Sequence, residues 1–162
     1  MKAQTWSMDF ITSVVVFAIV FTVIMFAWNY STQKNAERTM FKDLQNTGLM
    51  ASDVLIRIPG SPPDWNESNV KSLGLAVREN VLNESKVKEF VLMDYSKAKA
   101  LLGIVDKEFY FRMEYLNDSV MEYDGITLEK GTYPAENTTI VPVERTVLFD
   151  GRISKFLFVL YA

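Results

Sequence analysis

The chain has 162 residues, a formal net charge of −3, and neither histidine nor cysteine. Without histidine it lacks the commonest general base, and without cysteine it lacks thiol nucleophiles, disulfides and the usual soft metal ligands. The small and evenly spread charge argues against a nucleic-acid partner. We therefore expect no enzymatic activity, no cofactor and no bound metal, and room for one domain plus an anchor.

The first predicted element is an apolar helix at 10–28, with the sequence FITSVVVFAIVFTVIMFAW. It contains no charged residue. At about 1.5 Å per residue the helix is about 28 Å long, close to the hydrocarbon thickness of a bilayer. A secretory signal peptide usually has a shorter apolar core and a small-residue cleavage site, and no such site follows this run. We predict a short N-terminal tail at 1–9 and a transmembrane helix at 10–28.

An amphipathic stalk helix is predicted at 29–58, because this segment has no proline and Gly48 is its only glycine. Apolar or small residues recur at alternating spacings of four and three, which is the seam of a heptad repeat. The seam packs either on the chain's own head or on a neighbouring helix. The candidate assembly seam consists of Met40, Leu44, Ala51 and Val54.

Basic residues follow the apolar run at Lys34, Arg38 and Lys42, four residues apart on one helix face. Such a stripe is either a solvated face or a contact with lipid headgroups or a neighbour's acids. The helix should end near Arg57, because Pro59-Gly60 and then Pro62-Pro63 interrupt it.

The head is predicted at 59–162 and begins with a loop in which Trp65 is a buried anchor. Asn83 is predicted to cap a short helix that follows it. A second short helix is expected at 96–102 and should stop at Gly103.

After Asp106 the hydrophobic period changes to two, as in the segment EFYFRMEYL. A weaker strand at 126–129 follows an Asp124-Gly125 turn, and the clearest hairpin has Asp150-Gly151 between two β-rich runs. Pro142 should place its strand at an edge or a bulge. The expected fold class is α+β: a long N-terminal helix, small helices, then a C-terminal antiparallel sheet.

Five Asn-x-Ser/Thr sequons favour an exported head that carries glycans. They are Asn29, Asn66, Asn83, Asn117 and Asn137. The lysines and arginine after the apolar run favour the opposite orientation, whereas the very short N-terminal tail agrees with the sequons. Acidic residues at 118, 122 and 124 are either a calcium loop or a solvated turn, and the turn is favoured.

The residues 2–9 and the run after them resemble the class III signal peptide of archaeal prepilins, within the type IV pilin superfamily. Lys2 and Ala3 match the basic and small residues before the cut, and Gln4 matches the first mature residue. Asp9 then falls at mature position six, and cutting after Gln4 would place it at position five, where the family has its acid. In the head, the resemblance rests on Gly60-x-Pro62 with Trp65, Gly74-Leu75, Leu82-Asn83-x-x-Lys86 and Arg145…Phe149-x-Gly151.

The resemblance implies a pilin-like fold and a structural subunit, major or minor, of an extracellular or envelope filament. It implies that the apolar helices bundle together, that Asp9 pairs with the N-terminal amine of a neighbouring subunit, and that a prepilin peptidase removes the leader. Its partners would be further copies or other pilin-like subunits, with the lipid bilayer before assembly. The alternative is a single-pass anchored head that binds a protein or envelope component without polymerising.

Overall fold

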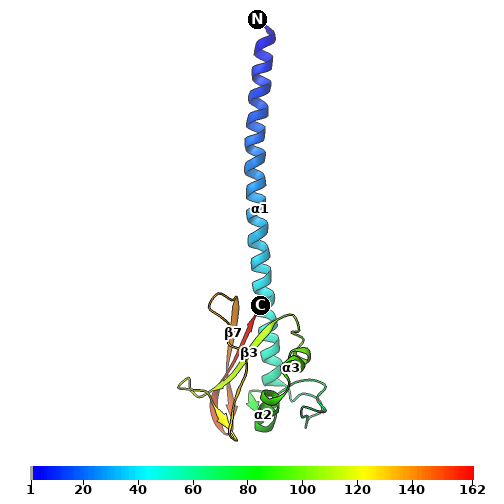
Figure 1. Ribbon diagram of the computed structural model, residues 1–162, viewed down its shortest axis with the longest axis vertical. Coiled ribbons are helices and arrows are strands. Elements are labelled where there is room, and N and C mark those ends of the chain that lie inside the picture. Colours follow the sequence, from blue (N-terminus) through cyan, green and yellow to red (C-terminus); the bar gives the residue numbers. More distant parts are fainter. Residues whose placement is uncertain (1) are drawn as a thin grey trace. The chain divides into compact units, whose positions relative to one another are not determined.

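The structure is a computed structural model that describes the backbone of residues 2–162 and the side chains of residues 8–35 and 38–162. The chain forms two compact units, Met1–Phe41 and Lys42–Ala162. The boundary between them falls inside the segment predicted as the stalk. The elements, some of which are labelled in Figure 1, are α1 (Lys2–Arg57), β1 (Ala76–Arg78), β2 (Val81–Leu82), α2 (Glu84–Leu92), α3 (Tyr95–Leu102), β3 (Glu108–Glu114), β4 (Glu122–Tyr123), β5 (Ile126–Thr127), β6 (Glu129–Gly131), β7 (Ile140–Phe149) and β8 (Arg152–Tyr161).

Helix α1 ends at Arg57, as the prolines that follow it predict. The loop after it returns and satisfies the carbonyl groups that the end of a helix leaves free. The amide of Leu75 donates to Leu55 O at 2.8 Å, and the amide of Asn80 donates to Ile56 O at 3.0 Å. Trp65 is buried, as expected, and its indole Nε1 donates to Gly74 O at 2.8 Å. The loop is therefore held on the helix end by backbone pairing and one aromatic anchor.

The main sheet has six strands in the order β1-β2-β7-β8-β3-β6. The prediction of an antiparallel sheet is wrong in one respect, because β2 pairs parallel to β7 and the sheet is mixed. This pairing joins Val81 to Leu148, and the amide of Leu148 donates to Asn80 O at 2.8 Å. Strands β1 and β2 are so short, and their partner lies so far along the chain, that neither alternation nor a turn signal marks them.

Both Asp-Gly turns form as predicted. In the β7–β8 hairpin Asp150 has φ +49° and Gly151 has φ +70°, the two positive values of a type I′ turn. Asp124 and Gly125 have φ +52° and +74° in the small β4–β5 hairpin. Pro142 pairs only with Val159 of β8, because β2 reaches β7 only near Leu148. The proline thus lies where the other edge of β7 has no strand, as its missing N–H requires.

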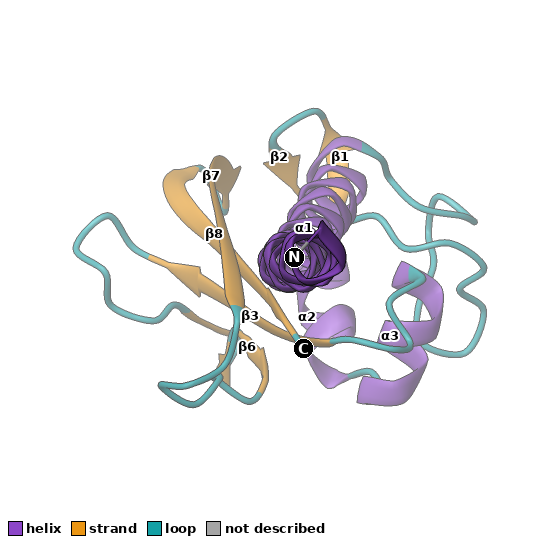
Figure 2. Ribbon diagram, turned by 90° about the horizontal axis from the view of Figure 1, so that it is seen from above, coloured by secondary structure: helices purple, strands orange, loops and turns teal. Residues whose placement is uncertain are grey.

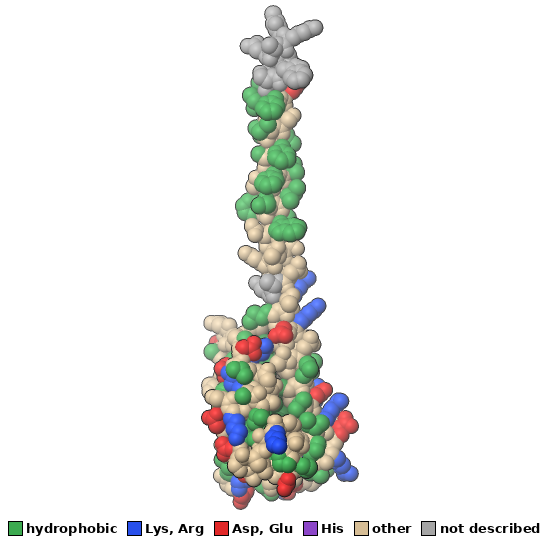
Figure 3. All heavy atoms as spheres, turned by 90° about the vertical axis from the view of Figure 1, so that its right-hand side faces the viewer, with side chains coloured by type: hydrophobic (Ala, Val, Ile, Leu, Met, Phe, Trp, Pro, Cys, Tyr) green, Lys and Arg blue, Asp and Glu red, His purple; other side chains and the backbone are tan. Residues whose placement is uncertain are grey.

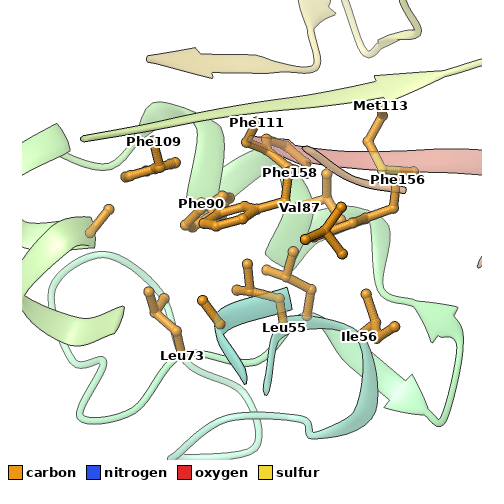
Figure 4. Packing of buried hydrophobic residues seen from close by; sticks show 14 of the residues in the cluster. Leu55, Ile56, Leu73, Val87, Phe90, Phe109, Phe111, Met113, Phe156 and Phe158 are labelled. Carbon is orange, nitrogen blue, oxygen red and sulfur yellow. The ribbon is translucent and has the colours of Figure 1, made fainter. Parts of the chain in front are cut away.

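The core of the head lies between the sheet and the helices α1 and α2, which cover the same face (Figure 2). Phe90 of α2 packs against two rings of β3, with centroids 6.2 Å from Phe109 and 5.2 Å from Phe111. Phe158 of β8 stacks on Phe109 at 5.4 Å. Leu55 of α1 is fully buried in the same cluster (Figure 4). The head therefore completes a hydrophobic core without cross-links.

The helix boundaries of the head follow their capping residues. Asn83 caps α2, since its Oδ1 accepts from the amide of Lys86 at 3.1 Å. Asp94 caps α3 in the same way, and α3 ends at Gly103 in the left-handed conformation, with φ +71°. The sequence predicted the cap at Asn83 and the stop at Gly103, but it did not predict the cap at Asp94.

Candidate functional site

The apolar segment of α1 exposes its side chains on every side. All described side chains from residue 8 to residue 35 are exposed, and those of Phe17 and Phe26 are 68% and 73% exposed. Figure 3 shows these apolar side chains on the visible face of the helix. Its most apolar 18 residues have a mean hydropathy of 2.7, and within the described part of the chain only this helix is long and apolar enough to cross a membrane. Such a surface needs lipid or other protein as a covering.

The polar groups inside this segment are satisfied by the helix itself. Three hydroxyl groups donate to the carbonyl four residues earlier: Thr12 to Met8 at 2.9 Å, Ser13 to Asp9 at 2.8 Å and Thr22 to Ala18 at 2.7 Å. Because no hydroxyl donor needs water, this part of the helix suits either a hydrocarbon or a dry protein environment.

Asp9 is the carboxylate nearest the start of the apolar segment, and its side chain is exposed. Among the described side chains no cation lies within salt-bridge distance of it. The predicted leader residues Ala3 and Gln4, like Lys2, lie outside the residues whose side chains are described. The pairing of Asp9 with a neighbouring subunit and the cleavage of a leader therefore stay predictions.

The four residues of the predicted assembly seam are in different environments. Leu44 and Ala51 are buried in the core of the head, with 1% and 5% exposure. Met40 and Val54 are 52% and 40% exposed. The buried pair belongs to the face of α1 that also carries Leu55, so its apolar surface is already covered within the chain. Only the exposed pair is available to a partner.

The basic residues after the apolar segment are all exposed: Lys34, Arg38 and Lys42. The ammonium of Lys34 lies 4.6 Å from the ring centroid of Tyr30, a cation–π contact within the helix. Among the side chains that the structure describes, none forms a salt bridge with these three residues. The stripe therefore offers positive charge to its surroundings, whether solvent, lipid headgroups or another protein.

Four of the five sequon asparagines are exposed: Asn29, Asn66, Asn117 and Asn137. Asn83 is half-buried and engaged as the cap of α2. In two exposed sequons the hydroxyl of the serine two residues later donates to the asparagine Oδ1, at 2.6 Å in Asn66–Ser68 and 2.7 Å in Asn117–Ser119. Exposure is compatible with glycan attachment at four sites, whereas a glycan on Asn83 would compete with its capping contact.

The acidic turn considered for calcium is occupied by lysines. Asp118 binds the ammonium of Lys155, and Asp124 binds that of Lys88. In the described part of the chain no three acidic residues come together at one point as a metal site requires. Arg112 and Glu114 form a further ion pair on the outer face of β3, where Glu114 is buried.

Burial or an ion pair shifts the pKa values of several ionisable groups in the head. The ammonium of Lys130 is buried and donates to Val91 O at 3.1 Å and to Met93 O, the carbonyls at the end of α2, and burial lowers its pKa. Burial raises the pKa of Tyr110 to about 12. Lys99 donates to Glu108 and holds the pKa of that carboxyl below its usual value, with a second contribution from Tyr95. The buried ammonium of Lys130 therefore closes the end of α2.

Comparison with known proteins supplies no relative. No family model matches the chain, and neither the curated proteins nor the solved structures yield a significant match.

Proposed function

We propose that the chain is a non-enzymatic, pilin-like structural subunit, major or minor, of an extracellular or envelope filament. Residues 10–28 anchor it in a membrane with the head outside the cytoplasm, and the same helix later serves as its polymerising element. The observation that carries the proposal is the apolar segment, whose described side chains are all exposed, attached to a head that completes its own core. Lipid covers such a segment before assembly, and neighbouring copies cover it afterwards.

Asp9 is central to this proposal because of its place at the start of the apolar segment. In a dry bundle of helices an unpaired carboxylate costs several kcal/mol, so it must meet a cation. The N-terminal amine of a neighbouring subunit, freed by a prepilin peptidase, has the right charge. In a lipid-anchored monomer the carboxylate lies at the wet interface, where an ion pair contributes at most about 1 kcal/mol. The two situations therefore respond differently to the loss of this charge.

The test compares wild type with Asp9→Asn for the yield of cross-linked oligomers and of filaments sheared from cells. We expect a sharp loss for Asp9→Asn, because the partner cation is left unpaired in the bundle. The matched control is Asp64→Asn, which removes an exposed carboxylate from the head and should leave the yield unchanged. Equal yields for wild type and Asp9→Asn, or no oligomer in either, would contradict the proposal.

The orientation of the head in the membrane is tested separately by cysteine labelling. The chain has no natural cysteine, so an introduced cysteine is its only thiol. Single cysteines at Ser68 and Asn137, both exposed on the head, should react with a membrane-impermeant thiol reagent on intact cells. Labelling only after lysis would place the head in the cytoplasm.

The second candidate is an anchored head that binds a protein or envelope component without polymerising. The burial of Leu44 and Ala51 within the head favours it, because this half of α1 then needs no neighbouring helix. A wild-type chain that stays monomeric in its membrane at every expression level would support this candidate.

A further inference from the structure

The head carries a surface groove where α1 meets the end of α3. Its volume is about 340 Å³. It is lined by Thr47, Met50, Ala51, Val54, Leu101, Leu102 and Gly103. Met50 and Val54 are 70% and 40% exposed, while Ala51 is 5% exposed. Ala51 is thus the buried residue of the lining, and the apolar side chains of Met50 and Val54 are exposed beside it.

This groove is uncharged on a head rich in charge. None of its lining residues is ionisable, although the head as a whole carries many acidic and basic side chains. The small residues Ala51 and Gly103 in its lining leave room for another chain to approach, and covering the exposed apolar side chains of Met50 and Val54 would remove apolar surface from water. An occupant that is itself charged would lose its hydration in this groove without gaining an ion pair. The groove therefore fits an apolar, uncharged occupant.

The chain itself contains such an occupant. The segment 10–28 has no charge and presents aromatic side chains, with Phe17 68% and Phe26 73% exposed. In knobs-into-holes packing a bulky side chain of one helix enters a hollow between the side chains of its partner, and an apolar groove can receive an aromatic side chain in a similar way. We propose that the groove at Met50, Val54 and Leu101 receives the apolar helix of a second copy of this chain. The inference rests on the proposed function and names the surface of the head that the neighbour's helix contacts.

The first experiment places a charge in the groove without touching the core. Met50→Glu in the full chain should lower the yield of cross-linked oligomers about tenfold or more, because a carboxylate buried against an apolar helix is unpaired. The matched controls are Val77→Glu and Leu116→Glu, at head positions that are 61% and 63% exposed and outside the groove. Both controls should keep the wild-type yield, and thermal melts should be the same for all four proteins.

The second experiment identifies the occupant. Cells co-express a Met50→Cys copy with a copy that carries a single cysteine at Phe17, Phe21 or Phe26. We expect an intermolecular disulfide between Met50→Cys and at least one of the three. A Ser68→Cys copy replaces Met50→Cys as the control and should give none. If Met50→Cys instead forms disulfides only with itself, the groove binds a second groove and the proposal is wrong.

The two proposals fail in different ways. If wild type forms no oligomer, the proposed function is wrong and this inference falls with it. If wild type forms oligomers that depend on Asp9, but Met50→Glu matches its controls and no mixed disulfide appears, only the groove assignment is overturned.

Discussion

Helix α1 is almost entirely apolar near its start and mixes apolar with polar residues near its end, and the apolar side chains of these two parts have opposite environments. In the segment 10–28 every apolar side chain is exposed, whereas Leu44, Leu55 and Ile56, near the other end, are almost fully buried. The difference comes from the pattern. In the second segment apolar residues are separated by charged ones such as Asp53, which leaves one face for the sheet and one for water. The first segment has no polar face, so its stability depends on what surrounds it.

Removing a large side chain should destabilise the head far more when the side chain is in the core than when it is in the apolar segment of α1. Phe158→Ala removes a ring stacked on Phe109 and should cost about 3–5 kcal/mol of head stability, through lost burial and the cavity left behind. Phe17→Ala removes an exposed ring and should change the free energy of unfolding of the head by less than about 0.5 kcal/mol. Denaturant unfolding of both variants in detergent, followed by near-ultraviolet circular dichroism, measures this. Comparable losses in both would show that the head depends on the apolar segment.

A charge introduced at two valines of similar exposure sharpens the same contrast. Val16 is 54% exposed and Val77 is 61% exposed. If the segment spans the bilayer as proposed, Val16→Lys should disfavour membrane insertion by about 2.5–3.5 kcal/mol, because its surroundings would be hydrocarbon. Val77→Lys, which faces water on the head, should be neutral. The readout is the fraction of chain that resists carbonate extraction. Full retention of Val16→Lys would mean that the segment does not lie in the bilayer as proposed.

The smallest expected effect lies in a turn of the head. Gly151→Val should lose about 1 kcal/mol or more, because a β-branched residue resists the positive φ of +70° at this position. Gly125→Val makes the same change in the much shorter β4–β5 hairpin and serves as the comparison. Thermal unfolding of the full chain in detergent gives both values. An unchanged melting temperature for Gly151→Val would contradict the assignment of a type I′ turn.

Features of the head that depend on neighbouring residues were predictable from the sequence. The end of α1 at Arg57, the cap at Asn83, the stop at Gly103 and the two Asp-Gly turns each depend on backbone preferences of a few adjacent residues. Pro142 could be placed at an open edge because its lack of an N–H excludes a central position.

Features that depend on distant residues were not predictable. The parallel contact of β2 with β7 unites segments more than sixty residues apart, and two-residue strands carry no periodic signal. The expected strand at 126–129 is divided between two strands, because the amide of Leu128 donates to Met121 O and its carbonyl accepts from the amide of Met113, both at 2.9 Å.

The candidate functional surfaces also depend on residues that are distant in the sequence, so the sequence predicted them only in part. The heptad pattern identified an apolar face of α1 but could not divide it into the part that the sheet covers, such as Leu44, and the part that stays exposed, such as Val54. The groove was missed because Leu101 and Leu102 lie on a different helix from Met50. A signal was present in Leu101-Leu102 before Gly103, two large apolar residues at the end of a short helix, but their neighbour could be found only from the fold.

Gly48 has a consequence for when the head can fold. A Cβ atom at this position would lie 3.6 Å from side chains of Val143 and Leu160, so the helix backbone rests directly on β7 and β8. These strands follow Gly48 by about a hundred residues of chain. Until they have emerged from the ribosome, the buried face of α1 has nothing to pack against, and contacts so distant in sequence form late. In the orientation proposed above, the chain would therefore still be unfolded while it passes through a translocation channel, and its head would fold only afterwards.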